Sequence, residues 1–228
     1  MVIIEQREGY SLAKKFFNYD NASSYDKLVK FATLGQDFYW KKKISDKVLE
    51  KGLVLDLACG TGILSSLMNK KGFDIHGVDL TFDYLKLSKT KSSEYFCING
   101  LAEFLPFKGN HFDFIISSYL PKYSDLILLV DECYRVLKGG GIVVLHDFIY
   151  PMRPILQELW KIYFKILKLG GGKFFKNWDK VFKELELLIM KSDWYYTLPN
   201  LLINKGFINV ISETLTFETS AIISAKKP

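Results

Sequence analysis

The stretch Val54-Leu55-Asp56-Leu57-Ala58-Cys59-Gly60-Thr61-Gly62 decides how this chain folds. Its first part is a short, continuous apolar run that carries an acid near its end, which is typical of a buried parallel strand. The glycines that follow let the backbone turn tightly and approach a ligand at the start of a helix. We therefore expect a strand, a ligand-binding turn and a helix, in this order.

Apolar runs and helix-like stretches alternate along the rest of the chain. They predict strands at 53–57, 74–79, 94–98, 112–118 and 141–147, with helices between them at 62–71, 82–91 and 126–137. The glycines at 139–141 are expected to end the last of these helices. Two β-rich runs at 207–212 and 215–223 predict a closing hairpin-like pair. The pattern indicates an α/β fold with a doubly wound, mostly parallel seven-stranded sheet and helices on both faces.

The length and composition favour one domain over residues 1–228. A chain of 228 residues that is 49% apolar can bury one full α/β core. Within it, the pattern predicts an N-terminal helical cap (1–51), a cofactor-binding core (52–147), a helical lid (148–202) and closing strands (203–228).

Charge and cysteine usage point to a cytoplasmic protein. Cys59, Cys97 and Cys133 are far apart in the sequence and form no C-x-x-C pair, which favours a reducing compartment. No apolar run approaches the roughly 20 residues of a membrane span, and charge appears before any signal sequence could form. No metal site is expected. Of the net charge of +6, the segment 152–191 contributes +5, with nine Lys/Arg against four acids.

The glycine-containing turn leaves two cofactors to consider. A nicotinamide dinucleotide is disfavoured, because Ser65 occupies the third glycine position and Asp56 would repel a pyrophosphate. S-adenosylmethionine (SAM) has no phosphate, and its ammonium suits a carboxylate, so SAM is the predicted cofactor. Asp79 ends the next apolar run and is predicted to accept hydrogen bonds from ribose hydroxyls, with a helix N-cap as the alternative.

These motifs resemble those of class I SAM-dependent methyltransferases, with Ala58 at the first glycine position of their first motif. More narrowly, the chain resembles the ubiquinone/menaquinone biosynthesis C-methyltransferases over nearly its whole length. The matching elements are Tyr25-Asp26-Lys27-Leu28, Leu34-Gly35-x-x-x-Tyr39-Trp40-Lys41, Ala102-Glu103-x-Leu105-Pro106-Phe107, Tyr134-Arg135-Val136-Leu137-Lys138-x-Gly140-Gly141 and Asp147-Phe148-x-x-Pro151.

The resemblance implies a SAM site, a Rossmann-like class I fold and a helical lid between the fifth and sixth strands. Its cofactor-binding residues would be Tyr25, Lys41, Asp56, Ala58, Cys59, Gly60, Thr61, Gly62, Asp79, Leu80, Leu101, Ala102, Ser118 and Tyr119. Leu101 stands where the family usually has an Asp or Asn that contacts the adenine amino group, so only backbone contacts from Leu101 and Ala102 are expected there. Residues 119–122 replace the family's Gly-Leu-Arg-Asn, which leaves the substrate open.

The resemblance also implies C-methylation of a lipophilic quinone or quinol precursor. The ring oxygen of such a substrate must lose its proton before the ring carbon attacks, so a base is needed. His146 and Asp147 at the end of the fifth strand, and Tyr119 after the fourth, are the candidate catalytic residues. His146 can alternatively be a hydrogen-bonded structural residue, and Asp147 an orienting group. O- or N-methylation of another small apolar molecule is the alternative function, followed by RNA methylation.

The segment 154–169 combines a polar stripe with a wide apolar surface. The stripe holds Gln157, Glu158, Lys161, Lys165 and Lys168. This pattern allows ordinary core packing, a roof over an apolar substrate pocket, or peripheral contact with an anionic membrane. Aromatic residues among apolar neighbours, with a single Arg among the nine basic residues of 152–191, argue against a nucleic-acid partner. The expected partners are a small lipophilic substrate and, peripherally, a membrane.

Overall fold

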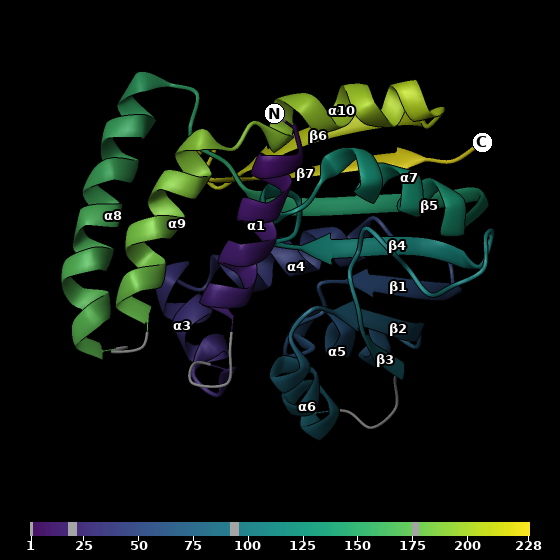
Figure 1. The fold of residues 1–228 in the computed structure, drawn as a ribbon, viewed down its shortest axis with the longest axis horizontal. Coiled ribbons are helices and arrows are strands. Elements are labelled where there is room, and N and C mark those ends of the chain that lie inside the picture. The colour runs from purple at the N-terminus through teal and green to yellow at the C-terminus, as the bar shows by residue number, and fades with distance from the viewer. Residues whose placement is uncertain (1, 18–21, 92–95, 175–177) are drawn as a thin grey trace.

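The computed structural model describes residues 2–17, 22–91, 96–174 and 178–228, and its core is a seven-stranded sheet (Figure 1). The strand order is β3-β2-β1-β4-β5-β7-β6, and β7 runs antiparallel to both of its neighbours while the other pairs are parallel. The strands are β1 (Leu53–Leu57), β2 (Asp74–Asp79), β3 (Phe96–Asn99), β4 (Phe112–Ser118), β5 (Leu137–Phe148), β6 (Ile208–Leu215) and β7 (Ser220–Lys226). The doubly wound, mostly parallel fold is confirmed. The start of the third predicted strand, 94–95, lies outside the described residues.

Side chains of neighbouring residues in the central strands point to opposite faces of the sheet, and each face is covered by helices. Leu55 and Leu145 pack in one cluster with α7 (Leu126–Val136) and α10 (Trp194–Lys205). Val54 and Val144 pack in the other with α4 (Gln36–Asp46) and α5 (Ile63–Lys70). The remaining helices are α1 (Val2–Phe16), α3 (Tyr25–Ala32), α6 (Phe82–Lys91), α8 (Pro154–Phe174), α9 (Asp179–Lys191) and the 3-10 turn η1 (Pro121–Tyr123).

The glycines at 139–141 do not end a helix, which corrects the sequence-based expectation. The helix α7 ends at Val136, and β5 begins at once with Leu137. The glycines lie within β5, where the register with β4 shifts. Gly141 passes so close to β4 that an added Cβ would lie 2.8 Å from the backbone oxygen of Asp113. Glycine is therefore required here by close strand approach and not by helix capping.

The closing antiparallel pair is present, but its turn lies further along the chain than expected. Residue 215 was predicted to begin the last strand, whereas β6 continues through Leu215 and β7 begins at Ser220. Thr216, Phe217 and Glu218 all have positive φ angles, between 41° and 60°. Non-glycine residues seldom adopt this conformation, so the sequence carried no signal for a turn at this point.

The cap and lid segments form one cover rather than two separate elements. Phe16 and Leu28 of the N-terminal helices pack in one cluster with Leu167 of α8, Phe182 of α9 and Trp178, the N-cap of α9. By contrast, α10 packs on α7, β6 and β7 and belongs to the layer over the sheet. Within the described ranges, no helix is both long and apolar enough to cross a bilayer.

Candidate functional site

Three residues of the turn after β1 adopt left-handed backbone conformations. Ala58, Gly60 and Gly62 have φ angles of 55°, 55° and 77°. The amide of Gly60 donates to Asp79 Oδ2 at 2.8 Å, and the amide of Thr81 donates to Asp79 Oδ1 at 2.7 Å. The carboxylate of Asp79 therefore fixes the turn after β1 and the turn after β2 relative to each other, at the edge of the sheet where ligands bind in open α/β folds.

Burial controls the charge of both acids at this edge. Desolvation raises the pKa of Asp56 to about 7, while a hydrogen bond from Ser65 Oγ and the charge of Lys41 favour the ionised form. Desolvation likewise raises the pKa of Asp79 to about 6, against the two backbone hydrogen bonds that it accepts. A bound cation beside Asp56 would return its pKa toward the ordinary range, because the opposite charge favours the carboxylate.

Two adjoining hollows occupy the carboxyl ends of β1, β2 and β4, and they bring together nearly all of the predicted cofactor residues. The residues that line both hollows are Tyr25, Ala58, Gly60, Ser118 and Tyr119. The smaller hollow, which we call the cofactor cleft, adds Lys41, Asp56, Cys59 and Thr61. The larger one, the aromatic cavity, adds Asp79, Leu80, Leu101 and Ala102 and holds about 770 Å³ of empty space, part of it open to solvent. Gly62 lines neither hollow and caps the start of α5.

The charges in the cofactor cleft fit the amino-acid end of SAM. Asp56 is a buried carboxylate that suits an ammonium, and Lys41 is a buried ammonium that suits a carboxylate. The hydroxyl of Thr61 donates to Asp26 of α3, which closes the cleft on the side of the cap. The cleft therefore presents one acid and one lysine, as a zwitterionic ligand requires. A pyrophosphate would instead lie beside the carboxylate of Asp56, which repels it.

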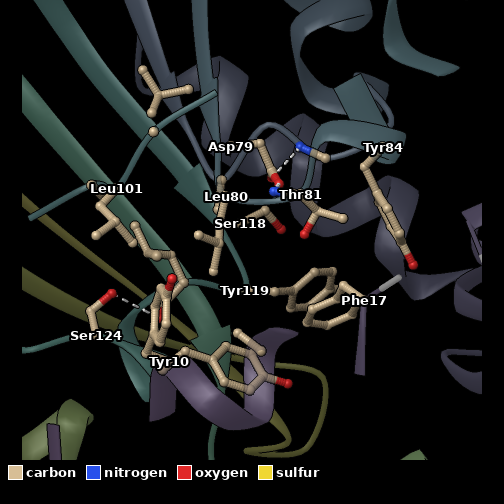
Figure 2. A pocket seen from close by; sticks show the side chains of 18 of the residues that line it. Tyr10, Phe17, Asp79, Leu80, Thr81, Tyr84, Leu101, Ser118, Tyr119 and Ser124 are labelled. Carbon is tan, nitrogen blue, oxygen red and sulfur yellow. Dashed lines mark hydrogen bonds between the residues drawn. The ribbon is translucent and has the colours of Figure 1, made fainter. Parts of the chain in front are cut away.

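Aromatic side chains form the side of the aromatic cavity opposite Asp79, and sequence reasoning missed them. Figure 2 shows Tyr10 and Phe17 of the N-terminal segment facing Asp79 and Thr81 across the cavity. The Phe17 ring lies 5.8 Å from Tyr123 and 5.9 Å from Tyr84, edge-on to both. The spacing of Tyr10, Ala13 and Phe17 on one helical face was the available signal, but nothing in the sequence shows what that face covers.

Tyr119 sits where the cleft and the cavity meet. Its φ angle is 71°, its ring stacks on Phe148 at 4.8 Å, and its hydroxyl donates to Asp37 Oδ1 at 2.8 Å. Asp37 also pairs with Lys41, whose ammonium lies 4.8 Å from the centre of the Tyr119 ring. Burial, followed by the charge of Asp37, holds the pKa of Tyr119 well above its usual value. Asp37 was not among the predicted site residues.

His146 and Asp147 do not reach either hollow. The ring nitrogens of His146 lie 3.1 Å from Ser118 Oγ and 3.2 Å from Ser220 Oγ, and burial holds its pKa well below the usual value. Asp147 pairs with Lys122 at 2.5 Å, and both side chains are almost fully buried. The structure therefore places a neutral His146 and the Lys122–Asp147 ion pair behind Tyr119. Neither His146 nor Asp147 lines the cofactor cleft or the aromatic cavity.

Comparison with known proteins agrees with this geometry. Residues 4–227 match the ubiE/COQ5 methyltransferase family. The demethylmenaquinone methyltransferase of Staphylococcus aureus is 28% identical over 211 residues, which cover 88% of this chain and 87% of that protein. Among solved structures, a protein from Methanococcus maripaludis described as a SAM-dependent methyltransferase superposes with a TM-score of 0.67 at 19% identity, over 94% of this chain and 95% of its own.

A second solved structure shows the same fold around a bound product of the cofactor. It is the geranyl diphosphate C-methyltransferase of Streptomyces coelicolor, in complex with S-adenosylhomocysteine, and it superposes with a TM-score of 0.61 at 13% identity, over 84% of this chain and 79% of that one. The family match covers almost every residue of the chain, and the acids and turns of its cofactor motifs meet at the two adjoining hollows. The chain therefore belongs to the ubiE/COQ5 methyltransferase family and is a SAM-dependent methyltransferase.

Proposed function

We propose that this enzyme methylates a ring carbon of a lipophilic quinol precursor. One observation carries the proposal: the cofactor cleft opens directly into a cavity whose far side is made of aromatic rings. Such a wall offers faces and edges on which a flat apolar acceptor ring can pack. The similarity to a demethylmenaquinone methyltransferase supports the same substrate class.

Each part of the site has a separate task in this proposal. Asp56 and Lys41 would hold the amino-acid end of SAM, and Asp79 its ribose. Bound there, SAM supplies an electrophilic methyl group on a sulfonium. The residues shared by both hollows, Tyr25 and Tyr119 among them, then lie between the two ends of the cofactor and border the place of transfer. Positioning of the two reactants contributes much of the rate in such a reaction.

In this proposal, Tyr119 and Asp37 remove the proton from the acceptor hydroxyl. Carbon becomes a nucleophile when the neighbouring ring oxygen loses its proton, and this needs an acceptor at the cavity. Of the three predicted catalytic residues, only Tyr119 lines the cavity. Its oxygen can take the substrate proton while its own proton passes along the existing hydrogen bond to Asp37. His146 and Asp147 keep a supporting role in the wall behind it.

An acceptor panel tests this function. The enzyme is incubated with labelled SAM and three acceptors of similar size: a short-tailed demethylated naphthoquinol, a catechol and an aryl amine. We expect label on the quinol and little on the other two. Transfer to the catechol oxygen or the amine, with the quinol untouched, would replace the proposal with the O- or N-methyltransferase alternative.

Contact with a membrane belongs to the same proposal. A quinol precursor with a long apolar tail resides in a bilayer, so the enzyme would act at the cytoplasmic surface of a membrane without crossing it. RNA methylation is the weaker alternative, since only one of the nine basic residues of 152–191 is an arginine and the aromatic residues there lie among apolar neighbours.

A further inference from the structure

Helix α8 carries a continuous apolar stripe on its outer surface. The five side chains of the stripe recur every three or four residues, which places them on one face of the helix. Each is between 56% and 75% exposed, and they are Ile155, Leu159, Ile162, Ile166 and Leu169. The sequence alone allowed core packing, a roof over the substrate pocket or membrane contact for this surface, and it did not show which apolar side chains remain exposed.

The fold itself does not use this stripe. The helix already packs on its neighbours through a different face, where Trp160, Phe164 and Leu167 are buried. Figure 1 shows α8 at the outer edge of the molecule, with α9 beside it. Exposed apolar residues normally occur singly, whereas a continuous row of them marks a surface that meets a partner.

The charge around the stripe indicates which partner. The segment 152–191 holds +5 of the net charge of +6. Lys161 and Lys165 are exposed on the same helix, on the polar side that adjoins the stripe. Two copies that paired their stripes would bring two strongly positive segments together, which is unfavourable. An anionic lipid surface instead offers an apolar interior and the complementary charge.

We infer that α8 lies along the surface of an anionic membrane, with the five apolar side chains of the stripe inserted at the boundary between headgroups and acyl chains. This inference rests on the proposed function in one respect, namely that the membrane would hold the acceptor. The apolar stripe provides the main attachment, and the excess of lysine provides attraction that salt screens.

Vesicle sedimentation tests the inference with matched variants. Ile162→Gln/Ile166→Gln removes the centre of the stripe, and Ile203→Gln/Ile211→Gln changes two residues of similar exposure on α10 and β6. Burial of two fewer apolar side chains should weaken partitioning to phosphatidylglycerol vesicles about tenfold or more. The control should stay within about twofold of the wild type, as surface substitutions usually do.

The outcomes separate this inference from the proposed function. Methylation of a short-tailed acceptor in solution should be unchanged in the stripe variant, because the stripe lies away from the cleft. Equal binding of the wild type and the stripe variant, or no preference for anionic vesicles, would overturn the inference. So would a concentration-dependent dimer that the stripe variant loses. Vesicle binding without methylation of any quinol would support the membrane-binding surface on α8 and reject only the proposed substrate.

A different observation concerns two cysteines that the sequence keeps far apart. Cys59 lies in the cofactor-binding turn, and Cys97 lies in β3 opposite Gly77 of β2. A Cβ added to Gly77 would lie 2.7 Å from Cys59 Sγ and 3.3 Å from Cys97 Sγ, so both sulfurs share the space left by the missing side chain. The two thiols hydrogen-bond each other, which raises the pKa of Cys59 and lowers the pKa of Cys97.

The geometry points to a peroxide-sensitive disulfide between Cys59 and Cys97 that switches off cofactor binding. Cys97, the less buried of the two, attacks the peroxide oxygen and becomes a sulfenic acid as water leaves. The Cys59 sulfur then attacks the Cys97 sulfur, the disulfide forms and a second water leaves. Closing the bond pulls on the turn whose Gly60 amide binds Asp79, so the SAM site loses its shape.

Thiol mapping and calorimetry test this switch on the whole chain. After hydrogen peroxide treatment, we expect a 59–97 disulfide peptide, loss of SAM binding and recovery with dithiothreitol. Cys97→Ser should keep SAM affinity under peroxide, whereas Cys133→Ala, which changes a buried cysteine elsewhere, should respond like the wild type. Equal loss of affinity in Cys97→Ser, or oxidation without the disulfide peptide, would refute the switch.

Discussion

The cofactor cleft and the cover above it are built in different ways. The cleft is built around the turn after β1, whose Gly60 amide donates to Asp79, and Lys41 of α4 also lines it. The cover is made by α1, α3, α8 and α9, which are far apart in the sequence and meet through aromatic and apolar contacts. In the proposed function, the first region binds the cofactor and the second region faces the acceptor.

This difference predicts that substitutions in the cleft change cofactor affinity and substitutions in the cover change acceptor affinity. The two regions meet at Tyr119, which lines both hollows and whose hydroxyl binds Asp37 at the start of α4. Substitutions that change turnover but leave the affinities for cofactor and acceptor intact should therefore be confined to this junction.

The largest effect is expected at Asp56. Asp56→Asn keeps the size of the side chain but removes the charge that suits the SAM ammonium. Loss of a charge-assisted pair should weaken SAM binding by about 2–3 kcal/mol, roughly 30- to 150-fold. Calorimetry with SAM and S-adenosylhomocysteine measures the change. Affinity within about threefold of the wild type would remove Asp56 from the cofactor site.

The pH dependence of SAM binding tests the same residue independently. Because burial raises the pKa of Asp56 to about 7, SAM must bind the ionised form in competition with a proton. Affinity should fall up to about tenfold per unit as the pH drops below about 7. The folded protein without ligand should also lose stability as the pH rises from 3.8 toward about 7, because its Asp56 holds a proton that the unfolded chain has released. Both trends should be weaker in Asp56→Asn, and an unchanged pH profile in that variant would assign them to another group.

At the junction, Tyr119→Phe should lower turnover about 10²-fold, within the range of general acid–base catalysis. The ring that lines the cavity is retained, so SAM affinity should stay close to that of the wild type. Single-turnover measurement at saturating SAM and acceptor isolates the step. A wild-type rate in Tyr119→Phe would mean that the Tyr119 hydroxyl takes no part in proton transfer and that catalysis depends on positioning of the reactants.

In the cover, Phe17→Ala should raise the KM for the acceptor about tenfold, because it removes a large part of the aromatic wall. The affinity for SAM should change far less. Leu34→Ala serves as the control, since that side chain is 75% exposed and lies outside both hollows. A loss of SAM affinity as large as the rise in KM would mean that the wall covers the cofactor rather than the acceptor.

The smallest effect on the chemistry is expected at His146. His146→Asn should leave the pH profile of turnover unchanged, because the ring is neutral and enclosed by Ser118 and Ser220. The free energy of unfolding should fall, since a buried hydrogen bond is lost. Disappearance of a pH-dependent limb near neutrality would restore His146 as the base.

The strand and turn at 54–62 could be predicted because their sequence information is local. The apolar run, the acid and the glycines of 54–62 lie side by side in the chain, so strand, turn and ligand could be inferred together. The register of β5 and the turn at 216–219 could not be inferred in this way. The register depends on a bulge beside β4, and the turn depends on three positive φ angles; both are set by neighbouring strands. The surroundings of His146 could not be inferred for the same reason: whether a strand-end histidine faces a cavity or is enclosed depends on side chains from distant strands.

The position of the transferred methyl group tests the central claim most directly. SAM labelled with ¹³C in its methyl group is incubated with a demethylated naphthoquinol and the wild-type enzyme, and the product is examined by carbon NMR. We predict a methyl carbon bonded to the aromatic ring, formed rapidly by the wild type and slowly by Tyr119→Phe. A methyl carbon bonded to oxygen, at any comparable rate, would contradict the account.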